Sequence, residues 1–165
     1  MDFLWTPWRY SYVTGAPEGG DPRGCVFCRI ANAGAPDRQS LLLHRAKHNF
    51  IVLNRYPYTS GHMLVVPYRH VAKLAAASEE TGAEMMDLTR RVERVLDKLY
   101  QPDGVNIGMN IGRAAGAGVA GHIHMHALPR WAADSNFATV IGETRVLPEA
   151  LEVPWERARA EFERS

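Results

Sequence analysis

The stretch Gly121-His122-Ile123-His124-Met125-His126-Ala127-Leu128 alternates small or polar residues with apolar ones, and three of its positions are histidines. An alternation with a period of two predicts a strand, here over residues 122–128. Because successive side chains of a strand point to opposite faces, the three imidazoles share one face, and Ile123 and Met125 can pack into a core on the other. Imidazole can act as a nucleophile, a base or an acid near neutral pH, so the histidine face is a candidate for catalysis.

Two other interpretations of the three histidines stay open at this point. The strand could be a histidine-lined surface strand without a function. It could also supply three ligands to the zinc of a metal-dependent hydrolase. Such sites usually draw their ligands from separated strands and need a nearby general base, and no Asp or Glu lies within the run.

A glycine-rich loop, residues 112–121, leads directly into the histidine strand. Glycines let backbone N–H groups come close to phosphate oxygens, and consecutive N–H groups can form an anion-binding nest. Loops of this composition are often simple turns. The adjacent histidines are what favour phosphate binding here.

Working outward, the sequence predicts four more strands and a long helix. The strands cover residues 41–44, 49–53, 63–67 and 105–111, which are rich in apolar and β-branched side chains. The helix is indicated by apolar residues at spacings of three and four, namely Met85, Leu88, Val92, Val95, Leu96 and Leu99.

The ends of the long helix are also marked in the sequence. Ser78 is the predicted N-cap, and Gln101-Pro102-Asp103-Gly104 ends the helix. Residues 147–163 carry a weaker helical pattern. Several strands around one long helix, without strict strand–helix alternation, predict an α+β fold: an antiparallel sheet of about five strands with one long helix and a C-terminal helix.

Composition excludes several classes of protein. The 165 residues suffice for one domain, and the net charge of +1, from 19 Lys+Arg against 18 Asp+Glu, argues against coating a nucleic acid. The N-terminus lacks the pattern of a secretory signal, and the longest apolar stretches are too short to cross a membrane. We therefore expect a cytoplasmic protein that binds neither membrane nor nucleic acid. Aromatic residues of the N-terminal segment could stack on bases, but packing on the domain or a partner subunit is favoured.

Cys25 and Cys28 form a single C-x-x-C pair. Without an export signal, this spacing indicates a metal or redox site more than a structural disulfide. A pair of reduced, partly buried thiols without metal is the alternative. A thioredoxin-like role is disfavoured because no strand–helix–strand context surrounds the pair.

Three motifs resemble the histidine-triad (HIT) family. Residues 121–131, G-H-I-H-M-H-A-L-P-R-W, resemble the signature H-φ-H-φ-H-φ-φ, with φ an apolar residue. Residues 54–70 resemble the family's G-H-x-L-V-x-P element, and residues 25–30, C-V-F-C-R-I, its frequent opening. The order and spacing are those of the family over about residues 25–131. Residues 131–137 and 144–149 resemble the bacterial branch similar to diadenosine tetraphosphate phosphorylases.

The resemblance implies an enzyme that cleaves dinucleoside polyphosphates at the α-phosphate, by phosphorolysis or hydrolysis. His124 would be the nucleophile that becomes nucleotidylated, and His126 would contact the phosphate oxygens or the leaving group. Asn54 stands where the family binds the ribose, whereas Asn110 and the backbone at Gly118 and Val119 would hold the phosphates. Apolar residues near Phe50 and Val52 would flank the base.

One departure from the family concerns phosphate binding. Many members carry Gln followed by Ser or Thr at the positions of Gly118 and Val119. The form found here is closer to the phosphorylase-like branch and shifts phosphate binding onto backbone N–H groups. Because two side-chain donors are missing, a nucleotide-binding or sensing module with little catalysis is the alternative function.

Resemblance to zinc-bearing members implies a structural zinc site. His70 and His122 would join Cys25 and Cys28 as its ligands. No cofactor is implied for catalysis. His44 and His48 are interpreted as ordinary strand-end histidines, and His62 as support for its loop. The family also implies a homodimer or higher oligomer, and the chain divides into an arm (residues 1–24), a core (25–131) and a C-terminal extension packed on the core (132–165).

Overall fold

The computed structural model describes residues 24–34, 36, 38–132, 134 and 149–164. It contains a five-stranded antiparallel sheet in the order β1-β2-β3-β5-β4, so the predicted α+β class is confirmed. The strands are β1 (Leu42–Arg45), β2 (Asn49–Leu53), β3 (Met63–Pro67), β4 (Gly104–Gly108) and β5 (Met125–Arg130). The helices are α2 (Val26–Asn32), α3 (Glu79–Tyr100) and α5 (Glu152–Arg164), with short 3-10 turns η1 (Leu74–Ala76) and η2 (Arg113–Ala115).

Some of the segments interpreted from the sequence lie outside the residues that the structure describes. The aromatic arm and most of residues 131–137 and 144–149 lie there. The three domain boundaries stay a prediction. Among the described residues, no helix is both long enough and apolar enough to span a membrane.

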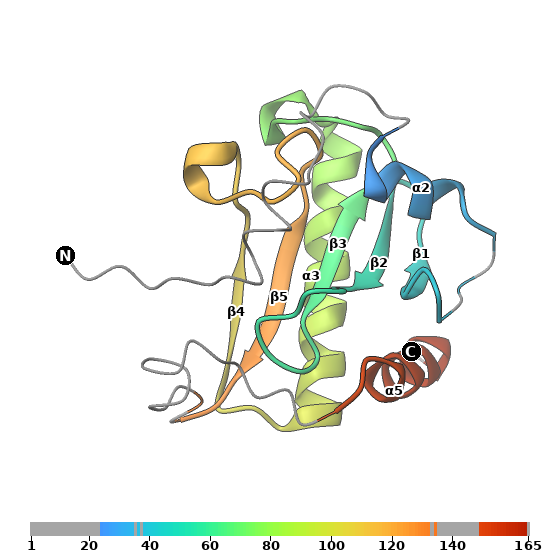
Figure 1. Ribbon diagram of the computed structural model, residues 1–165, viewed down its shortest axis with the longest axis vertical. Coiled ribbons are helices and arrows are strands. Elements are labelled where there is room, and N and C mark those ends of the chain that lie inside the picture. Colours follow the sequence, from blue (N-terminus) through green and yellow to red (C-terminus); the bar gives the residue numbers. More distant parts are fainter. Residues whose placement is uncertain (1–23, 35, 37, 133, 135–148, 165) are drawn as a thin grey trace.

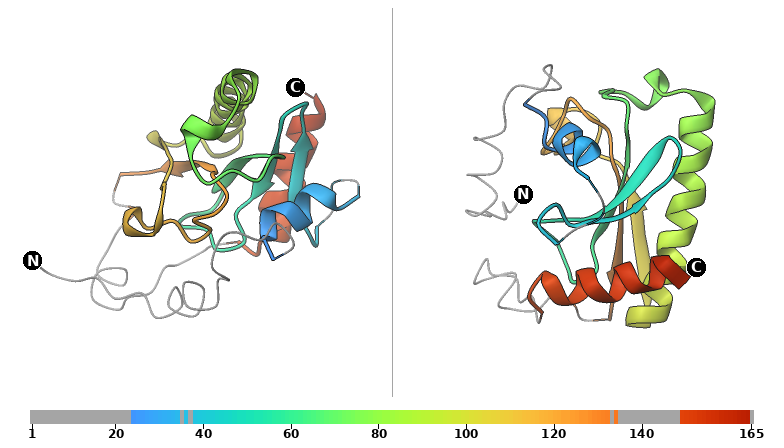
Figure 2. Two further views of the ribbon diagram at one scale, coloured as in Figure 1. Left: turned by 90° about the horizontal axis from the view of Figure 1, so that it is seen from above. Right: turned by 90° about the vertical axis from the view of Figure 1, so that its right-hand side faces the viewer.

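The long helix α3 covers one face of the sheet (Figures 1 and 2). Its apolar stripe packs on β2, β3 and β5. The predicted ends are confirmed: the Ser78 hydroxyl accepts a hydrogen bond from the Thr81 N–H, and Gln101 leaves the helix in the left-handed region at φ 45°. The short helix α2 lies on the opposite face (Figure 2). The sequence analysis did not predict it.

The histidine strand begins later than its alternation predicts. β5 starts at Met125, not at His122, and β4 ends at Gly108, where it pairs with His126. The reason is tertiary: the Ile123 N–H donates to the Val71 carbonyl at 2.8 Å instead of joining the β4 ladder. The predicted strand bounds at residues 122–128 and 105–111 were therefore wrong at these ends.

The C-terminal helix α5 covers the outer edge of β1. Trp155 Nε1 donates to the Leu42 carbonyl at 3.0 Å, and Arg159 Nη1 donates to the Leu43 carbonyl at 3.0 Å. A buried Glu161 accepts from Lys98 of α3 at 2.8 Å. Helix α5 thereby satisfies backbone carbonyls that an open edge strand would expose.

Acidification is expected to destabilise the docking of α5 through His44. His44 Nε2 accepts a hydrogen bond from Arg91 Nη1 at 2.9 Å, and its ring stacks on Phe162 of α5 with centroids 5.9 Å apart. Burial, together with the positive charges of Arg91 and Arg159, lowers the pKa of His44 against a smaller opposing effect of Glu84. Below about pH 6.5 the unfolded state therefore binds more protons than the folded state, and the free energy of unfolding falls as the pH falls.

Urea unfolding at pH 7.5 and pH 5.5 measures this effect. His44→Gln should reduce the difference between the two pH values, whereas His48→Gln, four residues further along, should retain it. An unchanged difference in His44→Gln would contradict the assignment to His44.

Candidate active site

A hollow beside the histidines is formed by segments far apart in the sequence. Helix α2 supplies one apolar wall, and the end of β2 with the loop that follows supplies another. The glycine-rich loop and two of the histidines complete the lining. The residues that line this hollow include Val26, Phe27, Ile30, Ser40, Leu41, Val52, Asn54, Arg55, Tyr58, Gly116, Gly118, His124 and His126.

His124 is positioned to act as a neutral nucleophile. The residue is 5% exposed, and its Nδ1 donates to the carbonyl of His122 at 2.9 Å. A carbonyl only accepts, so Nδ1 carries the proton and the lone pair lies on Nε2. Burial lowers the pKa of His124, partly offset by this hydrogen bond, which keeps the ring neutral near pH 7. The ring of Phe27 packs against it, with centroids 4.9 Å apart.

His126 is oriented by a fourth histidine, His62, which is fully buried. His62 Nδ1 accepts from the Tyr58 N–H at 3.1 Å, so the proton of a neutral His62 lies on Nε2. His62 Nε2 then donates to His126 Nδ1 at 2.9 Å. In a neutral His126 the remaining proton is on Nε2. The chain of hydrogen bonds thus gives adjacent imidazoles opposite roles: His124 offers a lone pair at Nε2 and His126 offers a proton at Nε2.

The pairing of His62 with His126 was not predicted from the sequence. The signal was present in Gly61-His62, within the second HIT-like motif, but the partner lies 64 residues away. Gly61 has φ +80°, and a Cβ there would lie 2.7 Å from Cε2 of Tyr100. Glycine therefore lets the chain pass close to α3 and bring His62 under the hollow.

Asn54 lines the hollow and has a fixed amide. Its Nδ2 donates to His62 Nδ1 at 3.2 Å, and its Oδ1 accepts from the Tyr56 N–H at 3.0 Å. The side chain is half-buried. The predicted role of Asn54 in binding ribose stays a prediction, to which the structure adds that Asn54 lines the same hollow as His124 and His126.

Of the other predicted binding residues, some line the hollow and others do not. Gly118 lines the hollow, as does Gly116, which sequence reasoning did not single out. Asn110 and Val119 are outside the described lining, and Val119 packs against the core. Of the two predicted base-flanking positions, Val52 lines the hollow, whereas Phe50 is buried against Tyr68. The apolar residues of α2 and Leu41 contribute more of the wall.

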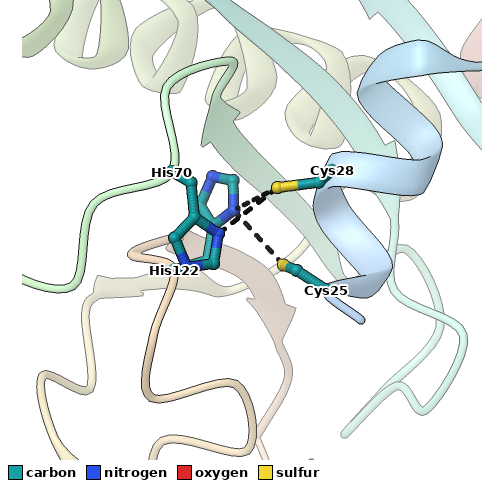
Figure 3. Close-up of side chains that lie close together, drawn as sticks. All are labelled: Cys25, Cys28, His70 and His122. Carbon is teal, nitrogen blue, oxygen red and sulfur yellow. Dashed lines mark hydrogen bonds between the residues drawn. The ribbon is translucent and has the colours of Figure 1, made fainter. Parts of the chain in front are cut away.

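His122 belongs to a separate cluster with Cys25, Cys28 and His70 (Figure 3). Its Nδ1 lies 3.4 Å from Cys25 Sγ and 3.6 Å from Cys28 Sγ, and His70 Nδ1 lies 3.3 Å from Cys28 Sγ. Ligand atoms of a tetrahedral zinc site are separated by roughly 3.3–3.8 Å, given Zn–S near 2.3 Å and Zn–N near 2.0–2.1 Å. The two thiols and two imidazoles therefore fit a closed Cys2His2 site.

The tautomer of His122 also suits a metal ligand. Its Nε2 donates to the Pro67 carbonyl at 2.8 Å, which leaves the lone pair on Nδ1 facing the cysteines. Burial lowers the pKa of His122 to about 4, so the ring is neutral at pH 7. Burial and Cys25 raise the pKa of Cys28 to about 11, so metal binding would displace a thiol proton.

Among the described residues this is the one group of three or more His, Cys, Asp or Glu side chains close enough to hold a metal. His122 is thereby separated from the pair His124 and His126. The geometry does not favour a three-histidine metal site as the catalytic centre.

The fold and the site built on His62, His124 and His126 point to one class of protein, which a family model identifies. The HIT domain model matches residues 36–133. The chain belongs to the HIT family.

Three similar proteins, one compared by sequence and two by structure, carry descriptive names. The chain is 40% identical over 153 residues to a protein named AP-4-A phosphorylase from Mycobacterium tuberculosis, covering 90% of this chain and 77% of that protein. It superposes on the crystal structure of a Zn-bound histidine triad family protein from Mycobacterium smegmatis with a TM-score of 0.68 and 28% identity, covering 87% of this chain and 96% of the other. The crystal structure of a hypothetical histidine triad nucleotide-binding protein from Sulfolobus tokodaii gives a TM-score of 0.67 at 28% identity, covering 85% of this chain and 93% of the other.

Proposed function

We propose that the protein is an enzyme that cleaves dinucleoside polyphosphates, such as diadenosine tetraphosphate, at the α-phosphate through a nucleotidyl-His124 intermediate. The observation that carries this proposal is the opposite polarity of two adjacent imidazoles, with a lone pair on His124 Nε2 and a proton on His126 Nε2. The similarity to the mycobacterial AP-4-A phosphorylase supports the substrate class.

In the first displacement, His124 Nε2 forms a bond to the α-phosphorus while the bond to the bridging oxygen breaks. The leaving oxygen of the departing nucleoside polyphosphate accepts a hydrogen bond from the His126 Nε2–H, which stabilises the negative charge that develops on that oxygen. The hydrogen bond from His62 Nε2 to His126 Nδ1 holds His126 in the tautomer that carries its proton on Nε2. Backbone N–H groups of the glycine-rich loop near Gly116 and Gly118 would bind the non-bridging oxygens.

In the second displacement, an oxygen of inorganic phosphate forms a bond to the α-phosphorus while the bond from phosphorus to His124 Nε2 breaks, and His126 keeps its Nε2 proton throughout. We favour phosphate over water because the 40% identical relative is named a phosphorylase. From diadenosine tetraphosphate the products would be ADP and ATP.

Product analysis tests this proposal. Turnover of diadenosine tetraphosphate with phosphate should give ADP and ATP in equal amounts, and omission of phosphate should stop it. AMP and ATP in the absence of phosphate would instead establish hydrolysis. Binding of AMP without any turnover would favour the alternative of a nucleotide-sensing module.

A structural zinc ion is part of the proposal. Cys25, Cys28, His70 and His122 would hold it, and it would tie α2 to the segment that precedes β5. The ion would supply no chemistry to the displacement, because its four ligand positions are filled by protein atoms. Thiol ligands need a reducing compartment, which supports the expected cytoplasmic location.

We also propose that a second copy of the chain pairs along β4. The other edge of the sheet, β1, has carbonyls bonded to α5, whereas no described residue pairs with the outer edge of β4. Ile107 on β4 is 44% exposed and Ile111 beyond it is 42% exposed. An open strand edge with apolar side chains favours pairing with another chain.

Ile107→Lys should therefore convert a dimer into a monomer, because a charged side chain on an edge strand opposes pairing. Sedimentation velocity at micromolar concentration measures the change. Met86→Lys, on an exposed part of α3, is the matched control and should remain a dimer. A dimeric Ile107→Lys variant would place the interface elsewhere.

A further inference from the structure

The ring of Tyr58 packs on both members of the His62–His126 pair. Its centroid lies 4.9 Å from that of His62, at an interplanar angle of 38°, and 6.1 Å from that of His126, at 19°. The rings of His62 and His126 are themselves 5.1 Å apart. The three rings therefore form one cluster, and Tyr58 lines the same hollow as His126.

The loop between β2 and β3 fixes Tyr58 in this place. The Asn54 N–H donates to the His62 carbonyl at 2.8 Å, and the His62 N–H donates to the Thr59 carbonyl at 3.2 Å. Pro57, directly before Tyr58, is buried, and its ring fixes its own φ at about −65°. Because the loop is closed by these backbone bonds, Tyr58 and His62 are held close together.

Tyr58 acts on the histidine pair through both its backbone and its ring. The Tyr58 N–H donates to His62 Nδ1 at 3.1 Å, which sets the tautomer of His62. The Tyr58 ring lies nearly parallel to the His126 ring. The backbone therefore determines which nitrogen of His62 carries the proton, and the ring restricts how the imidazole of His126 can turn.

Rotation of the His126 ring would break the alignment that the proposed chemistry needs. A turn about its Cβ–Cγ bond carries Nδ1 away from His62 Nε2, with which it now forms a hydrogen bond of 2.9 Å. The same turn moves the Nε2 proton from its place beside His124, whose ring centroid lies 4.8 Å from that of His126. During the turn the imidazole edge must swing toward the parallel Tyr58 ring. Since protein interiors are close-packed, this aromatic contact opposes the motion.

We propose that Tyr58 is a positioning residue, whose ring holds His126 in its hydrogen bond with His62 and so keeps the Nε2 proton of His126 directed at the leaving oxygen. The proposal rests on the proposed function, because that function gives the proton its use. The ring carries the effect and the hydroxyl does not, since the contacts with both histidines are ring contacts.

Steady-state kinetics with diadenosine tetraphosphate and saturating phosphate tests the catalytic consequence. Tyr58→Leu keeps an apolar side chain but removes the ring. Its kcat should fall about tenfold, the upper end of what one aromatic pair contributes, with a smaller change in KM. Tyr58→Phe keeps the ring and should retain the kcat of the wild type.

Proton NMR tests the positioning without turnover. The Nε2 proton of His62, which is shared with His126 Nδ1, should give a downfield signal in the wild type and in Tyr58→Phe. In Tyr58→Leu the signal should disappear through exchange with water. His62→Gln lacks this proton and therefore assigns the signal.

Phe162→Leu is the matched control. Phe162 of α5 also stacks on a histidine, His44, with centroids 5.9 Å apart and an interplanar angle of 19°. Its replacement removes an aromatic ring of the same kind outside the hollow. Measured below its unfolding transition, this variant should keep both the His62 signal and the kcat of the wild type.

If Tyr58→Leu retains either the His62 signal or the wild-type kcat, the proposal is overturned. Absence of the signal from the wild type would overturn it as well. A rise in KM at unchanged kcat would mean that Tyr58 only contacts the substrate, and a loss of kcat in Tyr58→Phe would assign the effect to the hydroxyl. If the wild type turns over no diadenosine tetraphosphate, the proposed function fails, and the NMR comparison alone decides whether Tyr58 positions His126.

Discussion

Replacing His124 by alanine is expected to reduce the turnover of diadenosine tetraphosphate by at least about 10³-fold, as removal of a covalent nucleophile does in other enzymes. The change removes the nitrogen that would attack phosphorus and leaves no second nucleophile in the same position, because His126 Nδ1 is bonded to His62. AMP affinity should change by only a few fold, since the walls formed by α2, Val52 and Leu41 remain. Steady-state kinetics and calorimetry on the same preparation measure the two quantities.

Two comparisons distinguish a nucleophile from a residue that only shapes the hollow. Acid-stable labelling is not expected for a phosphorus–nitrogen bond, so the adduct is sought by intact-mass spectrometry at neutral pH. Wild-type protein mixed with substrate and no phosphate should gain the mass of one nucleotidyl group, and His124→Ala should gain none. His48→Ala, on the loop between β1 and β2, is the matched histidine control. Undiminished turnover in His124→Ala would eliminate the nucleophile assignment.

The sheet and the long helix were predictable because their signals are local. β2 and β3 have the bounds that the apolar runs indicate, and α3 begins after Ser78 as its N-cap predicts. The start of β5 was not predictable in this way. His122 lies outside β5, where its ring contacts the Pro67 carbonyl and Cys25 Sγ. These contacts join segments far apart in the sequence, so the alternation of residues along the chain does not reveal them.

The residues of the candidate site likewise fall into those with a local sequence signal and those placed by contacts between distant segments. Sequence reasoning predicted roles for His124, His126 and Asn54 because their residue types and spacing form motifs, and the structure brings these three residues to one hollow. It did not assign His62 to His126, and it did not find α2 as the wall of the hollow. Helix α2 has seven residues, too few for a clear apolar period, and its N-cap residue is Cys25 without a side-chain cap. Its place follows from contacts with residues about a hundred positions away.

Loss of the proposed structural zinc ion is expected to have the second largest effect, on stability and on nucleotide binding together. Helix α2 carries two of the four proposed ligands, Cys25 and Cys28, and also carries Phe27, whose ring lies 4.9 Å from that of His124. The fourth ligand, His122, supplies the carbonyl that orients His124. Release of the ion would therefore free one wall of the hollow and one support of the nucleophile at the same time.

Cys28→Ser should bind less than one zinc per chain in a colorimetric metal assay. Loss of a metal site is among the few single changes that cost about 4 kcal/mol, which for a chain of this size lowers Tm by on the order of 10 °C. At a temperature where the variant is still folded, its affinity for AMP should fall about tenfold, or about 1.4 kcal/mol. Dialysis of the wild-type protein against a chelator should reproduce both changes, and added zinc should reverse them.

Val92→Ala provides the matched control. Val92 is fully buried on α3, away from the cysteine and histidine cluster, and its truncation should lower Tm through the loss of packing alone. Zinc content and AMP affinity should then be those of the wild type, measured below its transition. If Cys28→Ser retains full zinc, the ligand assignment is wrong. If it loses zinc but keeps its affinity for AMP, the ion stabilises α2 without positioning the wall of the hollow, and the coupling between the two sites is absent.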